Sequence, residues 1–223
     1  MPLLKIDDQV LEVTKGARVL DAALEAGIEI PHYCYHPALS VVGSCRMCLV
    51  EIEGMPKLQT SCSTSVGEMP AEKKFAGQYD MVVHTQTDKV AAARKLILEF
   101  LLLNHPLDCP VCDQAGECDL QDYTFKYGHA HSRFIEDKRV RVAEELGAGV
   151  VINQDRCILC TRCVRFTREI SGTAELFVMN RGYHNKVSVF EGQPLDNPLA
   201  GNVADICPVG ALLLKDYMHT TRV

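Results

Sequence analysis

Alternating hydrophobic and polar residues near the N-terminus predict a small unit of mixed α and β structure. Two such runs, at residues 3–6 and 10–13, flank polar residues that suit a turn, and together they predict a β-hairpin. Apolar residues follow at helical spacing over residues 19–26, and Gly27 fits the position just past the end of a helix. We therefore expect residues 1–83 to form one α+β domain.

A longer amphipathic helix is predicted over residues 88–104. Its apolar face carries Val90, Ala93, Ile97 and Leu101. Its polar side carries Arg94, Lys95 and Glu99. Pro106 ends the helix, because the residue before a proline is disfavoured in the helical region. His105 should therefore stand at the helix exit.

The C-terminal third of the chain combines short strands with a helix. The predicted strands cover residues 150–152, 176–179 and 187–190, and the predicted helix covers residues 162–170. The whole chain then divides into three predicted domains, at residues 1–83, 84–148 and 149–223.

Composition and charge are those of an ordinary folded protein. The 223 residues are 47% hydrophobic and 23% charged, with a formal net charge of −6, whereas binding to nucleic-acid phosphates needs a basic surface. The most apolar run, residues 96–103, is far shorter than the ~20 residues of a membrane span. The N-terminal residues lack the pattern of a signal peptide, so we expect a cytosolic protein with reduced thiols.

The eleven cysteines separate by spacing into three sets, with none left over. The first set is Cys34, Cys45, Cys48 and Cys62. The second set contains Cys109, Cys112 and Cys118, and His105 stands just ahead of it and can complete it. The third set is Cys157, Cys160, Cys163 and Cys207. The odd count and the two-residue gaps favour metal sites, mostly iron–sulfur, over disulfides.

The spacing of the first and third sets is typical of iron–sulfur proteins. Three cysteines with two-residue gaps and a distant Cys207-Pro208 form the bacterial [4Fe–4S] pattern, and no second run is present for Cys207 to serve. In the first set only Cys45 and Cys48 form a short pair, whereas a zinc ribbon would show two. We expect a [2Fe–2S] cluster at the first set and a [4Fe–4S] cluster at the third.

The second set is less specific when taken alone. A zinc site with three cysteines and one histidine is a fair alternative to a [4Fe–4S] cluster there. His129 and His131 are the other histidines nearby, but they lie in a polar stretch beyond the cysteines. His105 is therefore the expected fourth ligand.

Several arginines crowd the third set: Arg156, Arg162, Arg165 and Arg168. They form either a solvated helix face or a positive environment that stabilises a reduced cluster.

The order of the three sets, with ten residues between Cys34 and Cys45, resembles the large iron–sulfur subunit of bacterial NADH:quinone oxidoreductase, respiratory complex I. It is also similar to the small diaphorase subunit of NAD-reducing hydrogenases. The resemblance implies a β-grasp [2Fe–2S] domain, a helical [4Fe–4S] segment with one histidine ligand, and a bacterial-ferredoxin-like α+β domain. The usual large subunit continues into a molybdopterin-oxidoreductase-like domain, so this chain is a short version or a fragment.

The resemblance implies an electron-transfer subunit of an NADH:quinone oxidoreductase-type complex, with one [2Fe–2S] and two [4Fe–4S] clusters and no catalytic residue of its own. No Gly-rich dinucleotide motif follows a strand, so FMN and NADH are expected on a flavoprotein partner. A downstream iron–sulfur subunit would take the electrons toward quinone. The complex would lie on the cytoplasmic face of the inner membrane, with membrane contact only through partners. The alternatives are a diaphorase module of an NAD-reducing hydrogenase or formate dehydrogenase, and, more remotely, a zinc-scaffold binding protein.

Overall fold

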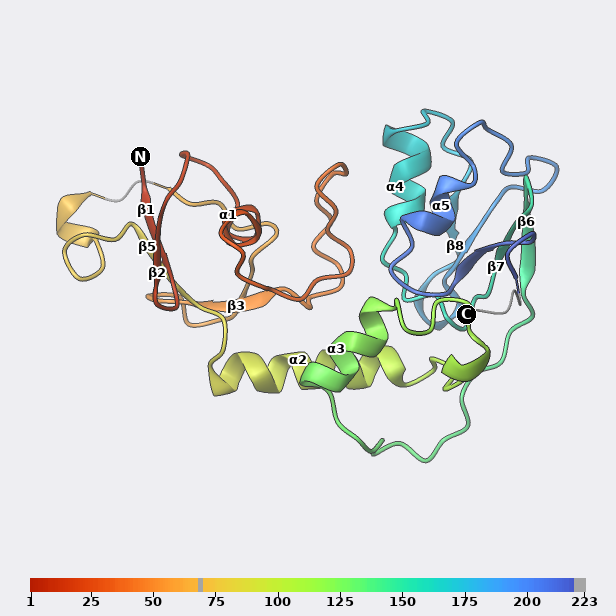
Figure 1. The fold of residues 1–223 in the computed structure, drawn as a ribbon, viewed down its shortest axis with the longest axis horizontal. Coiled ribbons are helices and arrows are strands. Elements are labelled where there is room, and N and C mark those ends of the chain that lie inside the picture. Colours follow the sequence, from red (N-terminus) through yellow and green to blue (C-terminus); the bar gives the residue numbers. More distant parts are fainter. Residues whose placement is uncertain (68–69, 219–223) are drawn as a thin grey trace. The chain divides into compact units, whose positions relative to one another are not determined.

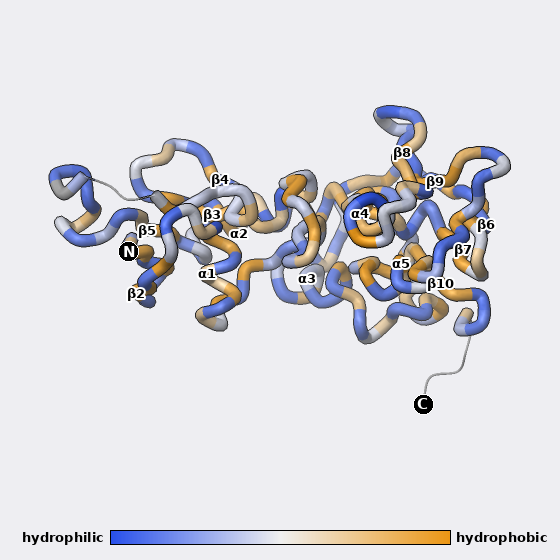
Figure 2. Tube along the Cα trace, turned by 90° about the horizontal axis from the view of Figure 1, so that it is seen from above, coloured by the Kyte–Doolittle hydropathy of each residue, from blue (hydrophilic) through white to orange (hydrophobic). Residues whose placement is uncertain are grey.

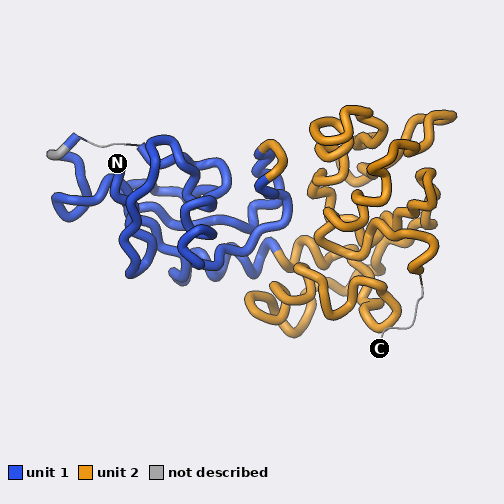
Figure 3. Tube along the Cα trace, turned by 45° about the horizontal axis from the view of Figure 1, so that its top comes forward, with its two compact units in different colours: residues 1–37, 41–97 blue, residues 38–40, 98–223 orange. Residues whose placement is uncertain are grey.

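The computed structural model describes residues 1–67 and 70–218. The chain forms two compact units of mixed α and β structure, which Figure 3 colours separately. The first unit contains residues 1–37 and 41–97, and the second contains residues 38–40 and 98–223. Each unit has its own hydrophobic core. No helix within the described ranges is long and apolar enough to cross a membrane.

A five-stranded mixed sheet forms the base of the first unit (Figure 1). Its strands are β1 (Leu3–Ile6), β2 (Gln9–Glu12), β3 (Leu49–Ile52), β4 (Gln59–Thr60) and β5 (Met81–His84). They lie in the order β2-β1-β5-β3-β4, with β1 antiparallel to β2 and parallel to β5. The first two strands confirm the predicted hairpin.

Helix α1 (Val19–Glu25) packs on this sheet, as a β-grasp fold requires. Its buried residues Val19 and Leu20 belong to the same core as Leu4 of β1 and Val50 of β3. Gly27 follows the helix with φ +72°, a left-handed conformation that suits glycine. A short 3₁₀ turn, η1 (Ala71–Lys73), lies between β4 and β5.

Helix α2 (Asp88–Leu102) ends two residues earlier than predicted, and its buried face differs from the predicted one. Val90 and Leu98 are fully buried, and Arg94, which we expected on the polar side, is only 3% exposed. Arg94 sits four residues from each of them and donates a hydrogen bond to the carbonyl of Leu49 at 3.5 Å. The prediction for Arg94 was wrong because apolar residues alone were used to define the face.

The second unit combines two small sheets with short helices. A three-stranded antiparallel sheet contains β6 (Glu144–Gly147), β7 (Val150–Ile152) and β10 (Leu212–Leu214), in the order β10-β7-β6. A separate antiparallel pair contains β8 (Phe177–Met179) and β9 (Lys186–Ser188). Helix α5 (Asn202–Asp205) packs against both α4 (Arg162–Glu169) and β10. Figure 2 shows α4 with hydrophobic residues on one side and hydrophilic residues on the other.

Several elements near the cysteine sets were not predicted from the sequence. They are α3 (Asp119–Tyr127), α5, β5 and β6, with the 3₁₀ turns η2 (Cys109–Val111) and η3 (Gly182–His184). Helix α3 has only one fully buried residue, Leu120, so it carries no apolar stripe that a periodicity argument could find.

Candidate metal centres

The first cysteine set surrounds loops beside the sheet of the first unit. Cys34 and Cys45 lie in the long connection between α1 and β3, Cys48 directly precedes β3, and Cys62 follows β4. The pairing of β3 with β4 holds the last two cysteines in register, because Ser61 donates to the carbonyl of Cys48 through its amide (3.1 Å) and its hydroxyl (2.9 Å). The structure therefore brings this predicted set together.

The four thiols of this set interact as two pairs. The thiol of Cys45 stabilises the thiolate of Cys34 and lowers the pKa of Cys34 to about 5, while the pKa of Cys45 is raised. Cys62 acts in the same way on Cys48, lowering the pKa of Cys48 to about 7, and the pKa of Cys62 is raised. Each iron of a [2Fe–2S] cluster takes two of the four thiolates, so two adjoining pairs fit that cluster.

The second set lies in the second unit between the end of α2 and the start of α3. Cys109 opens η2, and the amide of Cys112 donates to its carbonyl at 3.1 Å. Gly116 has φ +84°, which lets the chain turn back toward Cys118. Cys118 directly precedes α3, and burial raises its pKa, against the opposing effect of the amides in the first turn of the helix.

His105 lies three residues beyond the last residue of α2, as predicted, and it is half-buried. Burial lowers the pKa of His105 to about 4, and the charges of Arg156 and Lys138 add to the effect while Asp108 opposes it. The buried Nδ1 atom has no hydrogen-bond partner in the protein. A neutral imidazole with an unpartnered buried nitrogen has the form that binds a metal.

The third set converges on one cavity in the second unit. The cavity is lined by all four cysteines, Cys157, Cys160, Cys163 and Cys207. Apolar side chains from β7, β9 and β10 complete its wall: Ile152, Val187 and Leu212. Cys207 comes from the segment between α5 and β10, so the pairing of β10 with β7 carries it back to the other three cysteines.

The loop that holds the first three of these cysteines is wound tightly. Leu159 and Thr161 adopt left-handed conformations, with φ +54° and +60°, which are unfavourable for residues other than glycine. This winding points the amide of Leu159 at the sulfur of Cys157, at 3.5 Å. Left-handed residues at these positions therefore let a short loop wrap around a central group.

Burial dominates the electrostatics of the third set. It raises the pKa of Cys157 and of Cys160 to about 12, and it raises the pKa of Cys163 and Cys207 as well. Backbone amides oppose this effect at each sulfur and favour the thiolate. Four buried thiols have no use as an apolar core alone, whereas cationic iron would stabilise them as thiolates.

Two contacts connect the second set to the third. Gly210, three residues after Cys207, is so close to the second set that a Cβ atom added to it would lie 2.4 Å from the sulfur of Cys112. Arg156, next to Cys157, forms an ion pair with Asp108, next to Cys109, with nitrogen–oxygen distances of 2.5 to 3.3 Å. Both contacts lie within the second unit.

The arginines near the third set have different environments. Arg156 and Arg165 are buried, and Arg165 donates to the carbonyl of Cys160 at 3.2 Å, while Arg162 lines the cavity and Arg168 is exposed. Two of the four arginines are thus part of the packed unit rather than of a solvated face.

The cysteine sets differ from a site for a single ion. Among the residues that the structure describes, no three His, Cys, Asp or Glu side chains lie together as ligands of one metal ion would. A [4Fe–4S] cluster spreads its four protein ligands over four irons.

Three family models match the chain, each at one of the cysteine sets. Residues 3–71 match a 2Fe-2S iron-sulfur cluster binding domain. Residues 94–133 match the NADH-ubiquinone oxidoreductase-G iron-sulfur binding region. Residues 147–213 match the ferredoxin-like domain of NADH-quinone oxidoreductase subunit 3. The chain is therefore an iron–sulfur protein with [2Fe–2S] and [4Fe–4S] binding regions.

Relatives and a solved structure narrow this class. The chain is 48% identical over 219 residues to an NADH-quinone oxidoreductase subunit of Rickettsia bellii, the one designated G, and 46% identical over 217 residues to the NADH-ubiquinone oxidoreductase 75 kDa subunit of Reclinomonas americana. It spans 30% of the length of each of these two relatives, while 98% and 97% of the chain itself is covered. It also matches a chain in the crystal structure of an NAD+-reducing [NiFe]-hydrogenase, with a TM-score of 0.84 and 30% identity, covering 99% of this chain and 90% of the other. The chain belongs to the family of iron–sulfur subunits that NADH-quinone oxidoreductase and this hydrogenase share.

Proposed function

We propose that this chain is an electron-transfer module with one [2Fe–2S] cluster and two [4Fe–4S] clusters. The first cluster would be held by Cys34, Cys45, Cys48 and Cys62. The second would be held by His105, Cys109, Cys112 and Cys118. The third would be held by Cys157, Cys160, Cys163 and Cys207. The observation that carries this proposal is the enclosed cavity at the third set, where the fold brings Cys207 back to three cysteines on one tight loop.

Bound clusters supply one-electron carriers, and the residues of this chain bind them, orient them and limit the access of water. In this proposal the three sets correspond to three functional domains, at residues 1–83, 84–148 and 149–223. The family membership supports a role in a complex that oxidises NADH and reduces quinone. FMN and NADH would then be bound by a flavoprotein subunit, and a downstream iron–sulfur subunit would accept the electrons.

The complete assembly would lie on the cytoplasmic face of the inner membrane and touch the membrane only through its partners. A diaphorase module of a hydrogenase is the second candidate, and it is favoured specifically by the match over 90% of the hydrogenase chain. Subunits that copurify with the protein discriminate between the two assemblies, because only one of them contains a hydrogen-activating subunit.

Metal analysis after anaerobic purification tests the proposal. Three filled sites should give about 10 irons per chain, with a matching amount of sulfide. Stoichiometric zinc would contradict the assignment of the site that contains it. A second test is reduction by NADH, which should bleach the visible absorption only when the flavoprotein is present.

A further inference from the structure

The segment that follows α3 carries its basic side chains inward and its apolar side chains outward. Lys138, Arg139 and Arg141 are half-buried, whereas Val140 and Val142 are 89% and 84% exposed. We call residues 138–141 the basic strap. Burying three cationic side chains while exposing the valines between them is costly unless the cations have partners, and each of them does.

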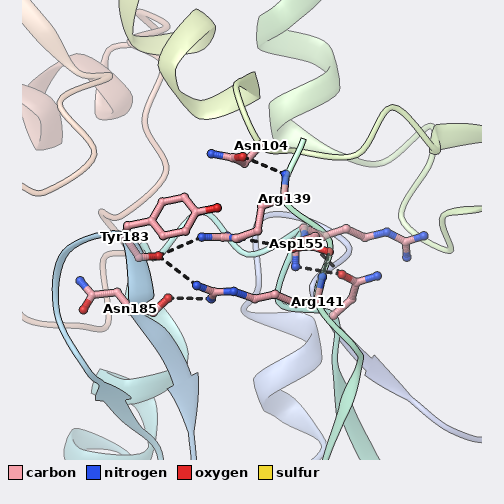
Figure 4. Close-up of polar contacts among 8 residues, drawn as sticks. Asn104, Arg139, Arg141, Asp155, Tyr183 and Asn185 are labelled. Carbon is pink, nitrogen blue, oxygen red and sulfur yellow. Dashed lines mark hydrogen bonds and ion pairs between the residues drawn. The ribbon is translucent and has the colours of Figure 1, made fainter. Parts of the chain in front are cut away.

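One side of the basic strap holds the end of α2. The ammonium of Lys138 donates to the carbonyls of Leu102 (2.6 Å) and Leu103 (3.1 Å). The last carbonyls of a helix have no partner inside the helix and carry partial negative charge, so a cation stabilises them. The amide of Arg139 donates to Oδ1 of Asn104 at 3.1 Å (Figure 4). The three residues directly before His105 are therefore all bound to the strap.

The other side of the strap is anchored to the third region. Figure 4 shows Arg139 and Arg141 reaching the carbonyl of Tyr183, at 3.1 and 2.9 Å, and Arg141 also donates to the carbonyl of Asn185 at 2.9 Å. The amide of Arg141 donates to Asp155 at 2.6 Å, two residues before Cys157. These bonds fix the strap within the second unit.

The side chain of His105 has no comparable restraint, since its buried Nδ1 atom has no partner in the protein. Its orientation must then come from the backbone that carries it. We propose that Lys138 is a positioning residue for His105: its bonds to the end of α2 hold the histidine where it can bind the [4Fe–4S] cluster of the second set. This inference rests on the proposed function, because it takes His105 as a ligand.

The test uses the complete protein, purified anaerobically with the subunits that accompany it. Lys138→Met keeps the length of the side chain and removes the donor to both carbonyls. Groups that orient a metal ligand typically affect metal affinity by 10- to 100-fold, so we expect an iron chelator to remove one [4Fe–4S] cluster about 10-fold faster or more. The EPR spectrum of that cluster should change, and Lys138→Arg should restore it.

Two further variants separate position from charge. Lys215→Met removes a lysine from an exposed ion pair with Glu145 in the same unit and should leave all EPR signals unchanged. Asn104→Ala removes the other bond to the strap without any change of charge and should alter the same EPR signal as Lys138→Met. It also serves as the test if Lys138→Met does not fold.

Unchanged EPR spectra and unchanged chelator kinetics in both Lys138→Met and Asn104→Ala would overturn the positioning role. The signals of the other two clusters act as an internal reference, since they should persist in every variant. If the wild-type protein itself showed no [4Fe–4S] signals, the proposed function would fail rather than the role of Lys138.

Discussion

Replacing Gly210 by alanine should disrupt the second cysteine set through a methyl group contributed by the loop of the third. The added Cβ would lie 2.4 Å from the sulfur of Cys112 and 3.0 Å from Cβ of Gln114. Non-bonded carbon contacts are favourable only near 3.5 to 4.0 Å, so the sulfur or the loop must move by about 1 Å. The φ angle of Gly210 is outside the left-handed region, so this steric conflict is the only expected strain.

Overpacking of this kind typically costs about 1–3 kcal/mol. Ligands must also be held within about 0.5 Å of their working geometry, so we expect loss of the cluster at the second set. That loss would lower the iron content from about 10 to about 6 per chain. Iron and sulfide analysis measures this result, and EPR identifies which signal disappears.

Gly201→Ala is a matched control in the same unit. Gly201 has helical φ and ψ angles of −60° and −34°, and an added Cβ would lie 3.8 Å from Leu214, an ordinary contact. This variant should keep all its iron and be as stable as the wild type or slightly more so. Equal iron content and equal thermal stability in the two variants would refute the steric reasoning for Gly210.

Three further predictions concern the same unit. His105→Cys should keep a cluster but lower its reduction potential in an EPR redox titration, because a thiolate adds negative charge, and His105→Ala should leave the cluster labile; an intact cluster of unchanged potential in the alanine variant would show that another group is the ligand. Asp108→Asn should destabilise the protein by about 1–3 kcal/mol in denaturant unfolding and Arg156→Met by less, since the side chain of Arg156 is 8% exposed and that of Asp108 is 33% exposed, so only the arginine would be left buried without a partner; the reverse order would contradict this reasoning. Thr161→Gly should be more stable than Thr161→Ala by about 1 kcal/mol in thermal unfolding, because φ at this position is +60°, and equal stability would mean that the loop carries no strain.

The ligand sets could be predicted from the sequence because cysteine spacing reports a short-range requirement. A loop such as that from Cys157 to Cys163 must wrap one small group, so its chemistry is written in adjacent positions. The helix exit at His105 was likewise predictable, since Pro106 acts on its immediate neighbour. The first hairpin and α1 follow from their own periodicity in the same way.

The contacts that organise the sites were not predictable, because they join segments that are distant in the sequence. Nothing near Lys138 indicates that it caps a helix ending at Leu102, and the apolar residues beside it suggest the opposite orientation of the segment. Arg94 was misplaced for a related reason, since its partner is the carbonyl of Leu49 on a strand far earlier in the chain. The closeness of Gly210 to Cys112 also depends on tertiary packing alone.

The position of Cys207 has a consequence for biosynthesis. A ribosome completes the first ligand set at Cys62 and the second at Cys118, but it exposes three thiols of the third set long before it adds the fourth. At about 5–20 residues per second, this interval lasts on the order of seconds. During that time Cys157, Cys160 and Cys163 are open to oxidants and to competing metals, whereas the loop and strand that enclose them exist only after β10 is made. Iron delivery to this site must therefore either wait for the last strand or protect an unfinished one.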